Sequence, residues 1–121
     1  MSRDWQLYWL DIIECCEKVL RYTQGMDRNT FFADERTYDA VVRNLEIIGE
    51  AAKRLPGDVR NLAPEIEWRK ISAFRDFVAH AYFGIDADIL WNVVSDKIPQ
   101  LLTALQPVSY THLTLPTIYS V

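Results

Sequence analysis

Hydrophobic residues recur at three- and four-residue intervals along most of the chain, which is the spacing of amphipathic helices. This pattern predicts helices over residues 4–23, 34–55 and 68–82. A last helix is predicted after Asp86, a suitable N-cap, with a kink at its internal Pro99. No strand-like alternation competes before residue 106. The sequence therefore predicts an all-α fold, an antiparallel bundle of four main helices.

Glycine and proline mark the expected breaks between these helices. Gly25 is a plausible helix stop within a polar loop at residues 24–30, and residues 57–63 are expected to connect the second and third helices. Pro64 suits the first position of the third helix. Gly49 lies inside the second helix on its apolar side. It is unfavourable there by about 1 kcal/mol relative to alanine, which predicts close approach of another helix.

The first predicted helix carries apolar residues outside its main stripe, namely Leu7, Leu10 and Ile13. A helix that is apolar on more than one side is usually buried on more than one side. In a protein of this size the pattern favours contact with a second chain.

The C-terminal stretch has a different character. Residues 108–121 carry no charge and do not continue the helical period. The segment VSYTHLTLPT resembles one translated frame of a transposase adapter used in shotgun sequencing. We therefore interpret residues 107–121 as a non-native tail, exclude His112 from function, and assign the bundle to residues 1–106.

Composition narrows the class of protein further. A chain of 121 residues with a net charge of −4 suits one domain and argues against a general polyanion binder, although not against a local basic cleft. No membrane-length apolar run or signal peptide is present in the sequence. Cys15 and Cys16 are adjacent, so they predict neither a structural disulfide nor a metal site. A cytoplasmic protein is expected.

The third predicted helix carries the clearest chemistry. Arg75 lies on the edge of its apolar stripe, where a charge is costly unless it is used. The guanidinium either reaches solvent or pairs with a carboxylate such as Asp76 or Glu46, or it is held in a cleft to bind a phosphate.

His80 and Tyr82 follow on the same helix. His80 is either a solvated histidine or an acid–base catalyst, with Asp76 one turn earlier able to orient it. Tyr82 shares a face with Arg75, and on spacing alone it is interpreted as an aromatic residue at the edge of the core. Arg75 and His80 are separated by about 140° around a straight helix. A common site needs a distorted helix, a long ligand or residues from a second chain.

Other signals are weaker. Glu46 and Glu50 are one turn apart, but no Glu-x-x-His partner accompanies them, so we expect a solvated face or ion pairs with Arg75 or Arg43 rather than a metal site. Nucleotide-binding and hydrolase motifs are absent from the sequence. A basic group flanking the third helix either lines a groove for a nucleic-acid backbone or is a solvated face: Arg54, Arg60, Arg69 and Lys70.

The segment RDFVAHAY at residues 75–82 resembles the Arg-x4-His-x-Tyr motif of the HepT-like proteins of the HEPN superfamily. The flanks agree, with NLEIIGEAAKRLP before the motif and ILWNVVSDKIPQLLTAL after it. The resemblance covers about residues 4–106. It implies an antiparallel bundle of four to five helices that forms a homodimer, with the motif lining a cleft between protomers.

The resemblance also implies a function. Such proteins are toxins of type VII-like toxin–antitoxin pairs and act as metal-independent endoribonucleases without a cofactor, on RNA such as tRNA or mRNA. By this likeness Arg75 and His80 are the catalytic pair, Asp76 supports them, and Arg54, Arg69 and Lys70 are candidate RNA contacts. An MNT-type nucleotidyltransferase antitoxin transfers AMP to the motif tyrosine, here Tyr82.

Two other functions remain open at this point. One is a non-catalytic helical binding module that pairs with a nucleotidyltransferase. The other is a structural dimeric bundle, which would tolerate changes at Arg75, His80 and Tyr82. The intact motif favours the ribonuclease.

Overall fold

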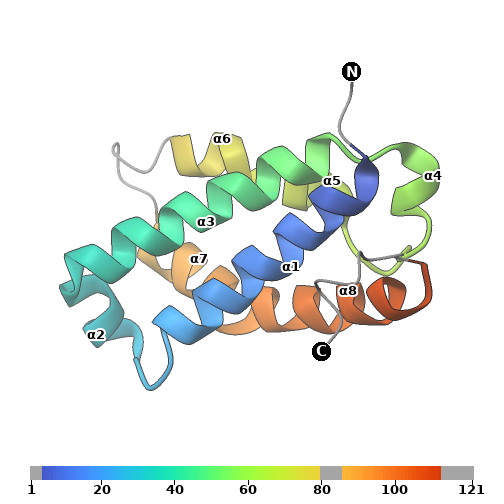
Figure 1. Ribbon diagram of the computed structural model, residues 1–121. Helices are drawn as coiled ribbons and strands as arrows, with labels where there is room; N and C mark the ends of the chain where they lie inside the picture. Colours follow the sequence, from blue (N-terminus) through green and yellow to red (C-terminus); the bar gives the residue numbers. More distant parts are fainter. Residues whose placement is uncertain (1–3, 80–85, 113–121) are drawn as a thin grey trace.

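The computed structural model describes residues 4–79 and 86–112, and within these residues every regular element is a helix (Figure 1). This confirms the all-α prediction. The elements are α1 (Trp5–Tyr22), α2 (Arg28–Ala33), α3 (Glu35–Lys53), α4 (Gly57–Arg60), α5 (Trp68–Ser72), α6 (Phe74–Ala79), α7 (Ala87–Asn92), the π-helix η2 (Val93–Lys97) and α8 (Ile98–His112).

Four rods form the bundle, namely α1, α3, the pair α5 and α6, and the run from α7 to α8. Helices α1 and α3 lie side by side in opposite directions, with α5 and α6 against α3, and α8 against the other side of α1 (Figure 1). The fourth rod is the continuous run of α7, η2 and α8. Consecutive rods run antiparallel, as the sequence predicted, and the bundle brings α6 onto the outer side of α3.

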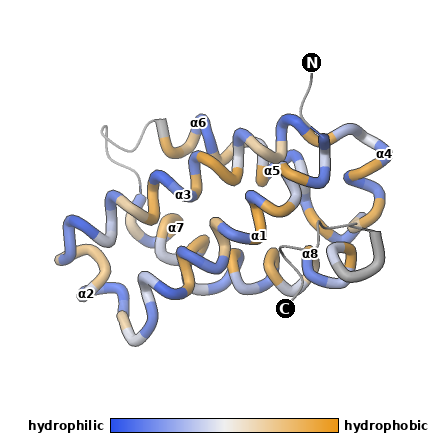
Figure 2. Tube along the Cα trace, in the orientation of Figure 1, coloured by the Kyte–Doolittle hydropathy of each residue, from blue (hydrophilic) through white to orange (hydrophobic). Residues whose placement is uncertain are grey.

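The core is built from the apolar stripes of these rods. Apolar segments alternate with polar ones along α1 and α3, as two amphipathic helices require (Figure 2). Trp9 is fully buried, its ring centroid lies 5.5 Å from that of Trp68, and its indole Nε1–H donates to the Leu105 carbonyl at 3.2 Å. These contacts tie α1, α5 and α8 together.

Side chains fix the helix ends as expected. Asp34 accepts a hydrogen bond from the Thr37 backbone N–H at 3.1 Å, and Asp86 accepts from the first turn of α7. Gly25 adopts a φ of 78°, which glycine adopts readily. The loop predicted at residues 24–30 is shorter than expected, because a capping box between Asp27 and Thr30 starts α2.

Several other boundaries differ from the prediction. The expected connector at residues 57–63 contains the single turn α4, and Pro64 lies in a turn instead of opening a helix. Where a kink was expected at Pro99, the structure has the π-helical turn η2 just before this residue. Since Pro99 has no N–H to give to the Ser95 carbonyl, a local widening of the helix is physically reasonable.

The last helix continues past residue 106. Helix α8 extends to His112, and Val108 is buried in the core. The prediction that the helical period ends before Val108 was therefore wrong, because Val108 falls on the inner face of α8. That residues 107–121 are non-native stays a prediction.

The third predicted helix is divided. Helix α5 ends at Ser72, Ala73 forms a turn with φ −72° and ψ −11°, and α6 begins at Phe74. The predicted buried stripe is nonetheless confirmed at Trp68, Ile71 and Val78. Phe74, also on the predicted stripe, is partly buried against the core, and the last two positions, Ala81 and Tyr82, lie outside the described residues.

In the part of the chain that the structure describes, no helix has the length and apolar character needed to cross a membrane.

Candidate functional site

The position of α6 is set by a glycine of α3. A methyl group added to Gly49 would lie 2.8 Å from the Arg75 backbone nitrogen, 3.3 Å from Phe74 Cβ and 3.4 Å from the Ile71 carbonyl oxygen. The first of these distances is shorter than van der Waals contact allows. The close approach predicted for Gly49 is thus confirmed, and its partner is the break between α5 and α6.

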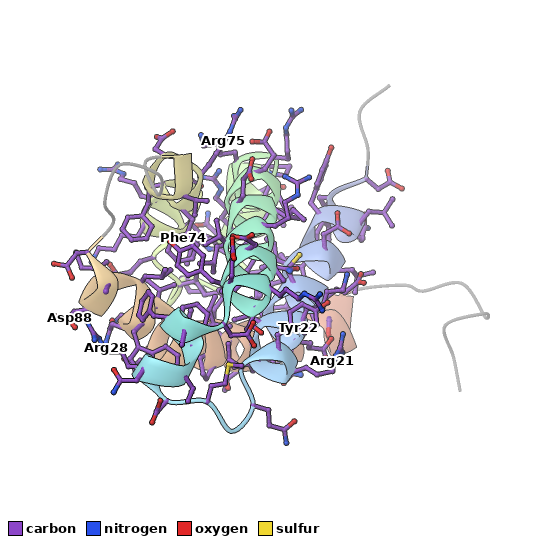
Figure 3. All side chains as sticks on the ribbon, turned by 90° about the vertical axis from the view of Figure 1, so that its left-hand side faces the viewer. Arg21, Tyr22, Arg28, Phe74, Arg75 and Asp88 are labelled. Carbon is purple, nitrogen blue, oxygen red and sulfur yellow. The ribbon has the colours of Figure 1, made fainter. Side chains whose placement is uncertain are left out.

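Phe74 and Arg75, the first two residues of α6, have side chains in different surroundings. Figure 3 shows Phe74 turned toward the interior of the bundle and Arg75 at its outer edge. The Arg75 side chain is 53% exposed, and its Nη1 lies 3.1 Å from Oε2 of Glu50 on α3. A half-exposed guanidinium is therefore fixed across two helices while keeping access to solvent.

Glu50 serves two arginines. Its Oε1 accepts a hydrogen bond from Arg54 Nη2 at 3.3 Å, one turn along α3, and its Oε2 faces Arg75. Glu46 pairs instead with Arg43 at 3.2 Å. The sequence allowed ion pairs from Glu46 and Glu50 to Arg75 or Arg43, and the structure assigns each carboxylate its arginine.

Arg75 opens onto a shallow groove. The groove has a volume of about 390 Å³ and lies between α1, α3 and α6. It is lined by Tyr8, Asp11, Arg43, Glu46, Ile47, Glu50, Ala51 and Arg75. Charged groups of both signs meet here, so Arg75 lies in a polar setting and not against the core.

A second groove lies on the other side of α5. It measures about 600 Å³ and is bounded by α5, α6, α7, η2 and α8, with Ile71, Phe74, Val93 and Leu101 in its wall. The sequence pattern did not predict it, because its wall combines residues of two separate segments, 65–74 and 88–104. Lys70 lines this groove and pairs with Glu67 at 2.7 Å, which holds the pKa of the Glu67 carboxyl below its usual value.

The other candidate RNA contacts have distinct surroundings. Arg54 and Arg69 are exposed at the end of the bundle where α3 finishes and α5 starts. Arg60 is instead structural, since its Nη2 donates to the Ala52 carbonyl at 2.9 Å and its own carbonyl accepts from Trp68 Nε1 at 2.9 Å. Of the basic group, Arg54 shares the Glu50 carboxylate with Arg75, Arg69 is exposed, and Lys70 faces the second groove.

His80 and Tyr82 lie outside the described residues. Asp76 is described and exposed on α6. Helix α6 is regular from Phe74 to Ala79, so the break in the third predicted helix falls before Arg75 and not between Arg75 and residue 79. Of the three ways to bring Arg75 and His80 together, a distortion of the helix therefore finds no support up to residue 79.

No group of potential metal ligands occurs among residues 4–79 and 86–112. Both cysteines are buried as free thiols, and burial raises the pKa of the Cys15 thiol to about 11 and that of Cys16 further. Neither is poised as a nucleophile, because the reactive form is the thiolate.

Comparison with known proteins identifies the family. Residues 12–108 match the family model described as ribonuclease HepT-like. The chain belongs to the HepT-like ribonuclease family. This confirms the family that the motif indicated, and with it the class of enzyme.

Curated relatives agree over most of their length. The "Probable ribonuclease HepT" of Thermococcus cleftensis is 44% identical over 101 residues, which is 84% of this chain and 92% of that protein. A "Putative RNase" of Methanocaldococcus jannaschii is 35% identical over 107 residues, 88% of each chain. Another protein with the same description, from Caldanaerobacter subterraneus, is 36% identical over 94 residues, 78% of this chain and 84% of that protein. No solved structure matches.

Proposed function

We propose that this protein is the toxin of a toxin–antitoxin pair and acts as an endoribonuclease that needs no metal, with Arg75 and His80 as its catalytic residues. The observation that carries the proposal is the setting of Arg75. In a chain of the HepT-like ribonuclease family, the motif arginine is anchored to α3 and still half exposed. The ion pair with Glu50 holds the guanidinium beside the groove between α1, α3 and α6 and leaves it accessible to a phosphate.

The chemistry follows from RNA itself. RNA carries its own nucleophile in the 2′-hydroxyl group. His80, as general base, takes the proton from this hydroxyl, whose oxygen then bonds to the adjacent phosphorus while the bond from phosphorus to the 5′-oxygen breaks. The leaving oxygen takes up a proton from a general acid. The products are a 2′,3′-cyclic phosphate and a 5′-hydroxyl end.

Arg75 stabilises the negative charge that develops on the phosphate oxygens in the transition state. A guanidinium is suited to this because its planar donors match two phosphate oxygens at once. Arg54 and Arg69 lie at the same end of the bundle and are candidate contacts for the neighbouring backbone phosphates, with Lys70 as a further candidate.

A second copy of the chain completes the site in this proposal. Leu7 is 44% exposed on α1, next to Tyr8, which lines the groove onto which Arg75 opens. The exposed apolar side chain of Leu7 supports a homodimer in which the second copy covers this side of α1. The partner would then bring its own Arg75 and His80 close to the first pair.

Control of the toxin is the last part of the proposal. A nucleotidyltransferase antitoxin of the MNT type adenylylates Tyr82. AMP adds a bulky anion close to Arg75 on the motif helix, which would exclude the RNA backbone. Mass spectrometry of the co-expressed pair tests this step, because a Tyr82 peptide without the mass of AMP would contradict it.

Expression in cells tests the function. We expect growth arrest and loss of intact RNA on expression of the wild type without its antitoxin, and neither effect with Arg75→Ala or His80→Ala at equal protein levels. If the wild type leaves RNA intact, the non-catalytic binding module becomes the better account.

A further inference from the structure

We infer that Glu50 is a positioning residue for Arg75, so that two consecutive residues of α3 place the catalytic arginine: Gly49 sets its backbone and Glu50 holds its guanidinium. This inference rests on the proposed function of Arg75. It concerns how the fold orients that side chain before any substrate is present.

The contact with Gly49 fixes the backbone position of Arg75. With 2.8 Å between the Arg75 nitrogen and the place of a methyl group on Gly49, α6 lies as close to α3 as only a glycine at position 49 allows. Any side chain at position 49 would push it away. The distance between the Cα of Arg75 and α3, the helix that carries Glu50, is therefore fixed.

The contact with Glu50 fixes the position of the Arg75 guanidinium. Glu50 Oε2 is buried and lies 3.1 Å from Arg75 Nη1, but no hydrogen bond of good geometry reaches it from the described residues. The contact is therefore a charge pair rather than an aligned hydrogen bond. A guanidinium carries five N–H donors, so most of them stay available to a phosphate.

The Glu50 carboxylate is itself held in place by a second arginine. Its other oxygen, Oε1, accepts from Arg54 at 3.3 Å along α3. A carboxylate held on one side by its own helix is a fixed anchor for a group on a neighbouring helix. Arg54, Glu50 and Arg75 thus form a chain of alternating charges from α3 to α6.

A positioning role has a kinetic signature. In Glu50→Gln one negative charge leaves the surroundings of Arg75, so attraction of RNA is retained or increased. Orientation of the guanidinium is lost, and a small misplacement of a catalytic group costs about 10- to 100-fold in rate. We therefore expect kcat to fall by about that factor, while KM is unchanged or lower.

Glu46→Gln is the matched control. Glu46 lies one turn earlier on α3, forms an ion pair with Arg43 of similar length, and has similar exposure. The substitution removes the same charge at nearly the same place, and we expect kcat to remain at the wild-type value. Glu50→Asp keeps the charge on a shorter side chain and should restore part of the lost kcat.

The position of Arg75 can also be followed without activity. The Nε–Hε signal of Arg75 in a ¹H–¹⁵N spectrum, assigned by its loss in Arg75→Lys, should report a restricted side chain in the wild type and in Glu46→Gln. It should report a mobile one in Glu50→Gln. Thermal melting of each variant checks that it is folded, and Glu50→Asp replaces Glu50→Gln if the latter does not fold.

The outcomes separate the two proposals. If wild type cleaves RNA and Glu50→Gln keeps its kcat, or if Glu46→Gln loses as much, the positioning role is overturned. A rise in KM with unchanged kcat also overturns it. If wild type does not cleave RNA at all, the proposed function fails. The Arg75 signal then still decides whether Glu50 holds that side chain, and equal mobility in wild type and Glu50→Gln overturns the inference.

Discussion

The backbone of Arg75 lies against Gly49 so closely that a methyl group there would be 2.8 Å from the Arg75 nitrogen. A core glycine of one helix thus determines the place of the proposed catalytic arginine on another. The atom in the way belongs to backbone, so relief requires a shift of α6 and not a rotation of a side chain.

Gly49→Ala should therefore lower both stability and activity. Alanine is favoured by about 1 kcal/mol in a helix interior, whereas overpacking costs about 1–3 kcal/mol. We expect the free energy of unfolding to fall by up to about 2 kcal/mol in chemical denaturation, and RNA cleavage to fall with it because Arg75 is displaced.

Gly57→Ala is the control for this prediction. A methyl group at Gly57 would meet nothing within 4 Å, and this residue opens α4. We expect a neutral to stabilising effect of up to about 1 kcal/mol. Equal destabilisation by both substitutions would show that the contact with Arg75 is not what makes Gly49 necessary.

Trp9→Phe should destabilise the bundle by about 2–4 kcal/mol, since it removes buried volume and the Nε1–H donor to the Leu105 carbonyl. Trp5→Phe is the comparison, because Trp5 is only half buried and packs edge-on against Trp9. Chemical denaturation measures both. A loss no larger for Trp9 than for Trp5 would contradict the role of Trp9 in joining α1 to α8.

The buried thiols predict a loss of stability at alkaline pH. The pKa of Cys15 rises from 9.0 to about 11 on folding, so the folded state favours the neutral thiol. Between these values the unfolded chain releases its proton first, and the free energy of unfolding falls as pH rises. The stabilisation is fully present below about pH 9.

Cys15→Ala tests the alkaline prediction. The variant should show a shallower decline of unfolding free energy than the wild type between about pH 9 and 11, whatever its stability at neutral pH. Identical slopes would contradict the burial of a neutral thiol at this position.

Arg69→Gln should weaken RNA binding without changing the chemical step. A lost phosphate contact raises KM and reduces the salt dependence of KM by about one counterion, while kcat is retained. Lys70→Gln should have the smaller effect, because Lys70 is paired with Glu67 and faces the second groove. The account of this surface fails if the order of the two effects is reversed.

Local signals in the sequence were sufficient for much of the fold. Helical periodicity located α1 and α3 within one or two residues, and the cap Asp86 was identified from residue type alone. Gly49 was recognised as a contact point because a glycine in a helix interior needs a reason. These features depend on residues close together in the chain.

Features that depend on distant contacts were missed. The break at Ala73 arises where α5 and α6 wrap around Gly49, and Ala73 itself is an ordinary helix former. The second groove needs Ile71 and Leu101 on facing rods, which no local pattern brings together. At the site, the position of Arg75 at the stripe edge was predicted, but its pairing with Glu50 rather than Glu46 depends on how α6 is set on α3.

The most direct test of the central claim is cleavage of a defined RNA by the purified protein in EDTA, with analysis of the new ends. We predict 2′,3′-cyclic phosphate and 5′-hydroxyl ends from the wild type, and no cleavage by folded Arg75→Ala or His80→Ala. Cleavage that EDTA abolishes, or that persists in both variants, would contradict a metal-independent ribonuclease built on Arg75 and His80.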